Sequence, residues 1–214
     1  MHALVFLLLF AVPVAPPSAP SSVGVPGQPS GKEAAVALPT ITYKYSVRGR
    51  GNSTDLEAFA SLAAETLADA RGWSLGGSIA FERVESGGHF TLWLAAPRHV
   101  PKFGKPCHWG LSCCIGRNVI INEARWTGAS DAWNAVGVPL RDYQHMVLNH
   151  EVGHRLGLVH QFCAGKGRTA PVMQQQTLGL QRCKPNGWPT VAERKRLSKR
   201  KGAPVIEPVE QATR

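Results

Sequence analysis

The chain has 214 residues, 43% of them hydrophobic, which is enough for one folded domain and excludes a chain that is disordered throughout. Its 24 Lys and Arg residues outnumber its 14 Asp and Glu residues, and the formal net charge is +10. Half of that excess lies in residues 190–201, where six basic residues accompany one acidic residue, so the rest of the chain is too weakly basic to favour nucleic-acid binding.

The N-terminal segment predicts export. An apolar run from Ala3 to Val14 is too short to span a bilayer and has the length of a signal-peptide core. No Lys or Arg precedes it, so an uncleaved anchor is the alternative. We therefore predict a signal peptide or anchor over residues 1–19, a Pro-, Ser- and Gly-rich linker over 20–39, a folded domain over 40–199 and a basic, disordered tail over 200–214. The predicted location is outside the cell or at the cell envelope.

The first part of the domain shows a strand pattern followed by a helix pattern. Apolar periodicity predicts a strand, a helix, two strands of a β-hairpin and one further strand, at residues 41–47, 56–70, 79–84 with 90–95, and 119–122. Asn52, Ser53 or Thr54 is expected to cap the helix. Gly87 and Gly88 predict the turn of the hairpin.

Two more helices follow. One is predicted from about residue 141 to residue 156, and a short last helix begins at Thr190, where Glu193 completes a capping-box pattern. The resulting order, β-α-β-β-β-α with a loop-rich end, predicts an α+β fold. We expect a mixed, mostly antiparallel sheet and a small loop-rich C-terminal subdomain.

The segment His150-Glu151-x-x-His154, with Gly157 and His160 after it, predicts a metal site. Histidines four residues apart lie on one face of a helix and can bind one ion, and the intervening glutamate can reach a water on that ion. Glycine permits the left-handed turn that ends the helix and returns His160 as a third ligand. Three neutral imidazoles and one open position are typical of catalytic zinc. We predict one Zn²⁺ ion held by the three histidines, with Glu151 as the catalytic base.

This spacing resembles the H-E-x-x-H-x-x-G-x-x-H signature of the metzincin clan of zinc endopeptidases. The resemblance implies a zincin-like fold with an active-site helix and a methionine turn beneath the metal, for which Met173 is the candidate. Residues 118–126 and 171–176 are also similar to a group of exported actinobacterial proteins of unassigned function with a metzincin-like domain. Some clan members place a tyrosine near the metal after the turn, but Gln174-Gln175-Gln176 follows here, so we expect three protein ligands.

The five cysteines also fit export. None of them forms a C-x-x-C pair, which disfavours a zinc ribbon. In an oxidising compartment we expect Cys107 to pair with Cys113 or Cys114, and Cys163 to pair with Cys183. The odd number leaves one thiol free.

Together these features predict a secreted or surface-tethered zinc metalloendopeptidase that acts on peptides or proteins as a monomer. The resemblance implies an edge strand that pairs with an extended substrate, and Val119–Asn122 is the candidate. The alternatives are a zinc hydrolase of cell-wall peptide amides and a non-catalytic zinc-containing module that binds a surface. The basic segment Arg194–Lys201 is either a solvated helix end or a contact with an anionic membrane or cell-wall surface, and nucleic acid is the least favoured partner.

Overall fold

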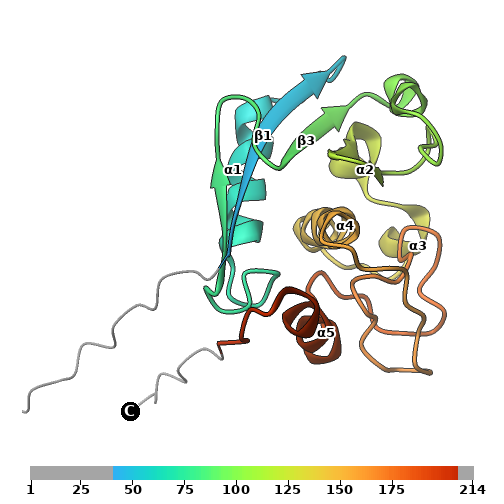
Figure 1. The fold of residues 1–214 in the computed structure, drawn as a ribbon. Helices are drawn as coiled ribbons and strands as arrows, with labels where there is room; N and C mark the ends of the chain where they lie inside the picture. Colours follow the sequence, from blue (N-terminus) through green and yellow to red (C-terminus); the bar gives the residue numbers. More distant parts are fainter. Residues whose placement is uncertain (1–40, 207–214) are drawn as a thin grey trace, which may run out of the picture. The chain divides into compact units, whose positions relative to one another are not determined.

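The computed structural model describes residues 41–206, so the predicted signal peptide or anchor, the linker and the last part of the predicted tail lie outside the described residues. The described chain is α+β, with a mixed five-stranded sheet and several helices (Figure 1). Its elements are β1 (Ile41–Arg50), α1 (Leu56–Ala68), β2 (Ile79–Arg83), β3 (Phe90–Ala95), the 3-10 helix η1 (Pro97–Phe103), β4 (Cys113–Ile115), β5 (Asn118–Asn122), α2 (Glu123–Gly128), α3 (Asp131–Asn134), α4 (Leu140–Arg155) and α5 (Val191–Lys201). Within residues 41–206, none of the helices combines the length and the apolar content that a membrane crossing requires.

The strands lie side by side in the order β2-β1-β3-β5-β4. β1 runs parallel to β2 and to β3, β3 runs parallel to β5, and β4 runs antiparallel to β5. The prediction of a mixed sheet is therefore confirmed, and the prediction of a mostly antiparallel one is wrong. The predicted edge strand, Val119–Asn122, is also wrong, because it belongs to β5 and lies between two neighbours. β4 occupies that edge of the sheet instead.

The predicted β-hairpin does not form. β2 pairs in parallel with the first half of β1, along one side of that strand. β3 pairs in parallel with the second half of β1, along its opposite side. Tyr45 is therefore opposite Arg83 on one side and Phe90 on the other. The connection crosses β1 at Gly88, where a Cβ atom would lie 2.7 Å from the carbonyl oxygen of Lys44. Two alternating strands joined by Gly-Gly suit either topology, and the sequence pattern does not identify the strand with which each one pairs.

Helix α1 starts at Leu56, as predicted, but its capping residue lies one position after the last of the three predicted caps. Asp55 is the capping residue, and its carboxylate accepts a hydrogen bond from the second amide of the helix. The prediction of a cap within residues 52–54 is therefore wrong. Ser53 and Thr54 instead donate their main-chain N–H and hydroxyl groups to the carboxylate of Glu123, the first residue of α2. These four hydrogen bonds join the start of α1 to the start of α2.

The two predicted helices of the second half are confirmed. α4 packs against β4, β5, α1 and α2, and most of its side chains from Tyr143 to Gly153 are buried. α5 begins at the predicted capping box, in which both hydrogen bonds between Thr190 and Glu193 are present. It ends at Lys201, past the predicted domain boundary at residue 199. The chain then stays on the domain as far as Ile206, whose N–H donates to a carbonyl of the α1–β2 connection.

Candidate metal centre

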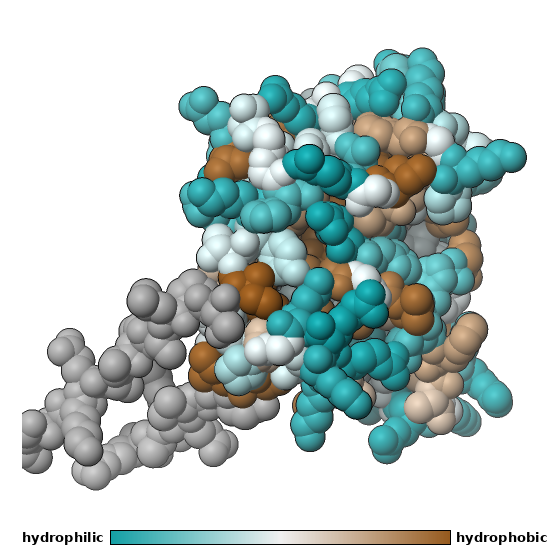
Figure 2. Space-filling model, viewed as in Figure 1, coloured by the Kyte–Doolittle hydropathy of each residue, from teal (hydrophilic) through white to brown (hydrophobic). Residues whose placement is uncertain are grey.

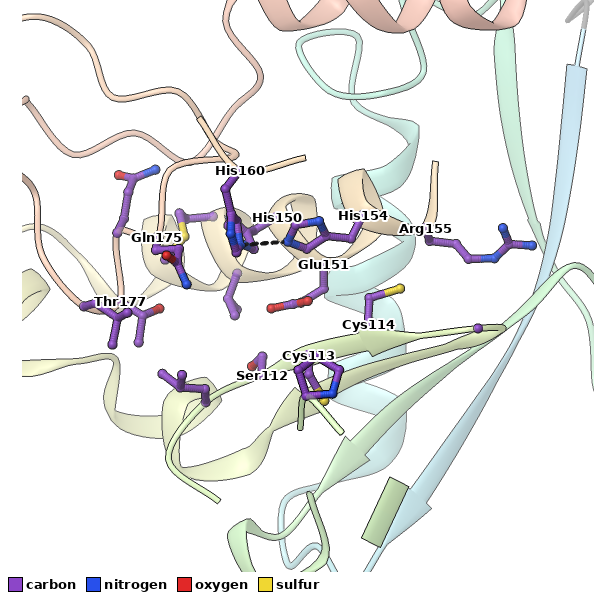
Figure 3. A pocket seen from close by; sticks show the side chains of 17 residues that line it. Ser112, Cys113, Cys114, His150, Glu151, His154, Arg155, His160, Gln175 and Thr177 are labelled. Atoms are coloured by element: carbon purple, nitrogen blue, oxygen red, sulfur yellow. Dashed lines mark hydrogen bonds between the residues drawn. The ribbon is translucent and has the colours of Figure 1, made fainter. Parts of the chain in front are cut away.

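Three histidines from α4 and the loop after it converge on one point (Figure 3). The Nε2 atom of His154 lies 3.2 Å from that of His150 and 3.1 Å from that of His160. Three nitrogens bound to one Zn²⁺ ion at 2.0–2.1 Å in tetrahedral directions would lie about 3.3 Å from one another. The donor set and its spacing therefore fit a metal ion, and the sequence predicted all three residues.

Main-chain carbonyl groups orient two of the three rings. Nδ1 of His150 donates to the carbonyl of Val172 at 2.8 Å, and Nδ1 of His154 donates to the carbonyl of Leu158 at 3.0 Å. A carbonyl oxygen only accepts hydrogen bonds, so the proton of each neutral ring is on Nδ1. The lone pair of Nε2 is left facing the common point, which is the usual arrangement of metal-binding histidine.

The return of His160 to the helix depends on Gly157. Its φ of +94° lies in the region that favours glycine, and the Leu158 amide beyond it donates back to the Gly153 carbonyl. A Cβ atom at Gly157 would lie 2.7 Å from the guanidinium of Arg200, on α5. The predicted helix-ending turn is therefore present, and α5 packs directly against it.

The carboxylate of Glu151 points into the space between α4 and β4 (Figure 3). The residue is 5% exposed, and within residues 41–206 the carboxylate has no hydrogen-bond or ion-pair partner. Burial raises its pKa to about 8. A divalent cation bound beside it would lower that pKa again. A carboxylate that exchanges protons near neutral pH is suited to general base catalysis.

The histidines are held in the neutral form that binds metal. Burial, followed by the neighbouring imidazole of His154, lowers the pKa of His150 to about 3. Burial also lowers the pKa of His154 and of His160. Neutral rings bind a metal ion without first releasing a proton.

The metal-free protein should be most stable near pH 6.5. The pKa of Glu151 is about 8 in the fold against 4.5 as the ordinary value, so the folded state binds an extra proton and this group adds stability as the pH falls from about 8 toward 4.5, unopposed by the three histidines until about pH 6.5. The pKa values of His150, His154 and His160 lie below the ordinary 6.5, so under pH 6.5 the unfolded chain gains protons on three rings against the one proton held by Glu151 in the fold, and stability falls.

Thermal melts in chelator between pH 8.5 and 4.5 test this profile. In Glu151→Gln the rise in Tm between pH 8 and 6.5 should be absent, while the fall below pH 6.5 should persist. A wild-type Tm that rises steadily from pH 4.5 to 8.5 would contradict the assignment of these pKa shifts.

The three histidines and Glu151 line a cavity of about 500 Å³. α4 forms one wall, residues 111–116 form the opposite wall, and residues 175–178 close one end. A second cavity of about 370 Å³ shares Leu111, Thr177 and Leu178 with the first. The site therefore opens into a longer depression, and β4 is the strand along its wall.

Met173, the predicted turn methionine, packs beneath α4. It is fully buried, and its Sδ atom lies 2.3 Å from the position that a Cβ atom on Gly153 would take. Gly153 occupies one of the two variable positions between His150 and His154, and a larger residue there would have to displace Met173 and would crowd Trp73, whose ring lies 3.1 Å from the Cβ position. The sequence pattern around Gly153 does not reveal this constraint, because it arises from a contact with a residue twenty positions away.

Both predicted local disulfides are present. Cys163 pairs with Cys183, and of the two partners left open for Cys107 the structure selects Cys113. Cys113 packs in a small cluster with Cys107, whereas Cys114 packs against the main core; both residues line the cavity. Cys114 is the free thiol, and burial together with the nearby Glu151 raises its pKa to about 12. Two disulfides fit an extracellular protein.

Residues 23–189 of the chain match the family described as "Protein of unknown function (DUF3152)". The match covers most of the chain, so the protein belongs to this family. It includes the three histidines, Glu151 and Met173, and ends just before α5. No curated protein matches the chain.

Proposed function

We propose that this protein is a zinc-dependent metalloendopeptidase that acts outside the cell or at its surface, with the zincin-like fold that its resemblance to the metzincins implies. The observation that carries the proposal is the convergence of three imidazole nitrogens beside a buried carboxylate that has no partner in residues 41–206. A structural zinc site is usually closed by four protein ligands, whereas three ligands leave a position for water. The cavity gives a substrate access to that position.

A bound Zn²⁺ ion would polarise the scissile carbonyl group and lower the pKa of a bound water to about 7. His150, His154 and His160 hold the ion with neutral rings. Glu151 takes the proton of the attacking water and passes it to the leaving nitrogen of the peptide. Because no other group in the described structure bonds its carboxylate, both oxygens are available for this transfer.

The strand that borders the cavity suggests how a peptide would bind. Among the described strands β4 has one neighbour, β5, so within residues 41–206 its outer edge has no strand partner and lies along the cavity that holds the three histidines. An extended peptide can pair with such an edge, which would align its backbone across Glu151. β4 therefore replaces β5 as the proposed substrate-binding strand.

Two other functions use the same residues. A cell-wall peptide amide would meet the same metal and base, and would differ in the loops that contact it. A non-catalytic module would need the metal but not Glu151, and burying a carboxylate without a partner costs stability. The position of Glu151 therefore favours an enzyme.

Mass spectrometry of peptides released from a denatured proteome, with and without a zinc chelator, tests the proposal. We expect internal peptide bonds to be cleaved, cleavage to stop in chelator and cleavage to return with added zinc. Purified cell wall is assayed in parallel. Release from the cell wall alone would favour the amide hydrolase, and a zinc-loaded protein that cleaves neither substrate would favour the binding module.

We also propose that α5 contacts an anionic membrane surface. Residues 155–206 contain eleven Lys and Arg residues and one acidic residue, whereas residues 41–154 contain eleven and ten. Within residues 41–154, four ion pairs join basic to acidic side chains, among them Arg83 with Glu57 and Arg141 with Glu65. Figure 2 shows hydrophilic side chains gathered over α5. Each basic residue near an anionic bilayer contributes about 1 kcal/mol.

The triple substitution Lys195→Gln, Arg196→Gln and Lys199→Gln tests this contact. It removes three exposed charges and leaves Leu197, on the buried face of α5, unchanged. Binding to vesicles that contain an anionic phospholipid should weaken by up to about 100-fold at low salt, as expected for three such charges.

The matched control removes three exposed charges from the other half of the domain, with Arg48→Gln, Arg98→Gln and Lys102→Gln. Its binding should change much less. Equal losses in both triple variants would mean that net charge alone drives adsorption, and unchanged binding in the α5 variant would make the helix an ordinary solvated one.

A further inference from the structure

We infer that Glu193 is a positioning residue of the metal centre, and that it acts on His150 through the peptide group between Val172 and Met173. The inference rests on the proposed metal site and does not depend on the proposed peptidase activity. Glu193 lies on α5, outside the cavity, and is 4% exposed.

One peptide group lies between the carboxylate and the imidazole. Its N–H, which belongs to Met173, donates to Oε1 of Glu193 at 2.8 Å. Its carbonyl, which belongs to Val172, accepts the hydrogen bond from Nδ1 of His150 at 2.8 Å. The N–H and the carbonyl of a trans peptide point in opposite directions, so the carboxylate, the peptide and the ring form one continuous chain of hydrogen bonds.

The dipoles of the hydrogen-bonded groups along this chain all point the same way. The negative carboxylate polarises the peptide group, which makes the Val172 carbonyl a stronger acceptor for the ring proton of His150. A firmly held Nδ1 proton fixes the ring and raises the basicity of Nε2, the atom that faces the metal. Metal-binding histidines commonly donate directly to a carboxylate, and here a peptide group stands between the two.

The capping role of Glu193 does not explain all of its contacts. Oε2 accepts from the N–H of Thr190 at 2.7 Å, which is one of the two capping-box bonds, and from the Thr190 hydroxyl at 2.8 Å. The same oxygen accepts from the Val172 N–H at 3.1 Å. The main-chain N–H groups of Val172 and Met173 are thus both bound to Glu193, in the first turn of α5. α5 therefore fixes the turn that orients His150.

The affinity of purified full-length protein for Zn²⁺, measured by competition with a colorimetric chelator, tests this role. Glu193→Ala should weaken zinc binding by about 10- to 100-fold, the usual effect of losing a partner of a metal-binding histidine. Its Tm should also fall. Glu193→Gln is the milder variant, because its single acceptor oxygen cannot serve the donors on both sides, and a smaller loss of affinity in the same direction is expected.

Two controls separate positioning from stability. Glu123→Ala removes another buried carboxylate that accepts four hydrogen bonds, at the start of α2 and outside the cavity lining. Thr190→Val removes the cap hydroxyl and leaves the carboxylate on the turn. Both should lower Tm and leave the zinc affinity within about twofold of wild type, because neither changes a partner of a metal-binding histidine.

Zinc affinity that falls only in the Glu193 variants supports the inference. Zinc affinity within about twofold of wild type in both Glu193 variants, or an equal loss in Glu123→Ala, would overturn it. A wild-type protein that binds no zinc would overturn this inference and the metal site together. A protein that binds zinc but cleaves no peptide would overturn the proposed activity alone.

Discussion

Glu151→Gln should lower the rate of peptide cleavage by about 10²–10⁴-fold, the usual contribution of a general base, while zinc stays near one ion per chain. The amide has nearly the shape of the carboxylate, and the backbone of α4 is unchanged. It cannot take up the proton of the attacking water. Cleavage kinetics, metal analysis and a thermal melt on the same preparation measure the three properties together.

The control for this variant is Glu85→Gln, which makes the same chemical change at an exposed position between β2 and β3. Its activity should equal that of wild type. A Glu151→Gln protein that cleaves at the wild-type rate would exclude the proposed mechanism. A Glu151→Gln protein that loses zinc would mean that the carboxylate is a metal ligand.

His154→Ala should remove zinc and activity together. The Nε2 atom of His154 lies within 3.2 Å of those of His150 and His160, so its loss leaves two nitrogens at the site. Apparent zinc-binding free energies of about 10–16 kcal/mol are shared among the ligands of a site, so losing one should weaken binding by at least about 100-fold. The variant also loses the hydrogen bond to the Leu158 carbonyl, and its Tm should fall.

His145→Ala is the matched control. His145 is a buried histidine on the same helix, and its ring faces away from the other three histidines. Its ring hydrogen-bonds to Thr66 and packs against Trp188. This variant should lose stability and keep its zinc. An equal loss of zinc in both histidine variants would mean that the metal depends on the folding of α4 in general and not on the three converging nitrogens.

The sequence predicted that the three histidines come together, because that information is local. Two of the histidines, His150 and His154, lie one turn apart on one helix, and Gly157 marks the place where the chain turns back. The capping box of α5 is equally local, and both of its hydrogen bonds are present. Helical periodicity also located α1 and α4 to within a few residues.

The predictions failed for features that depend on contacts between distant parts of the sequence. The strand partners of β2 and β3 are decided by how the chain crosses β1 at Gly88, which an alternating pattern does not encode. β4 has three residues and was not predicted, so the edge strand was misplaced. The sequence did not predict the contact of Glu193 with the methionine turn for the same reason, because its partners Val172 and Met173 lie twenty-one and twenty residues earlier in the chain.

The most direct test of the proposed zinc-dependent peptidase activity is a zinc titration of metal-free protein. Bound zinc and cleavage of one peptide substrate are measured at each point. We expect cleavage to rise in proportion to bound zinc and to stop rising at one ion per chain. In Glu151→Gln, zinc should bind to the same level while cleavage stays at least about 10²-fold lower. Cleavage by the metal-free protein, or a wild-type protein that takes up one zinc ion per chain and cleaves no peptide, would contradict the proposed activity.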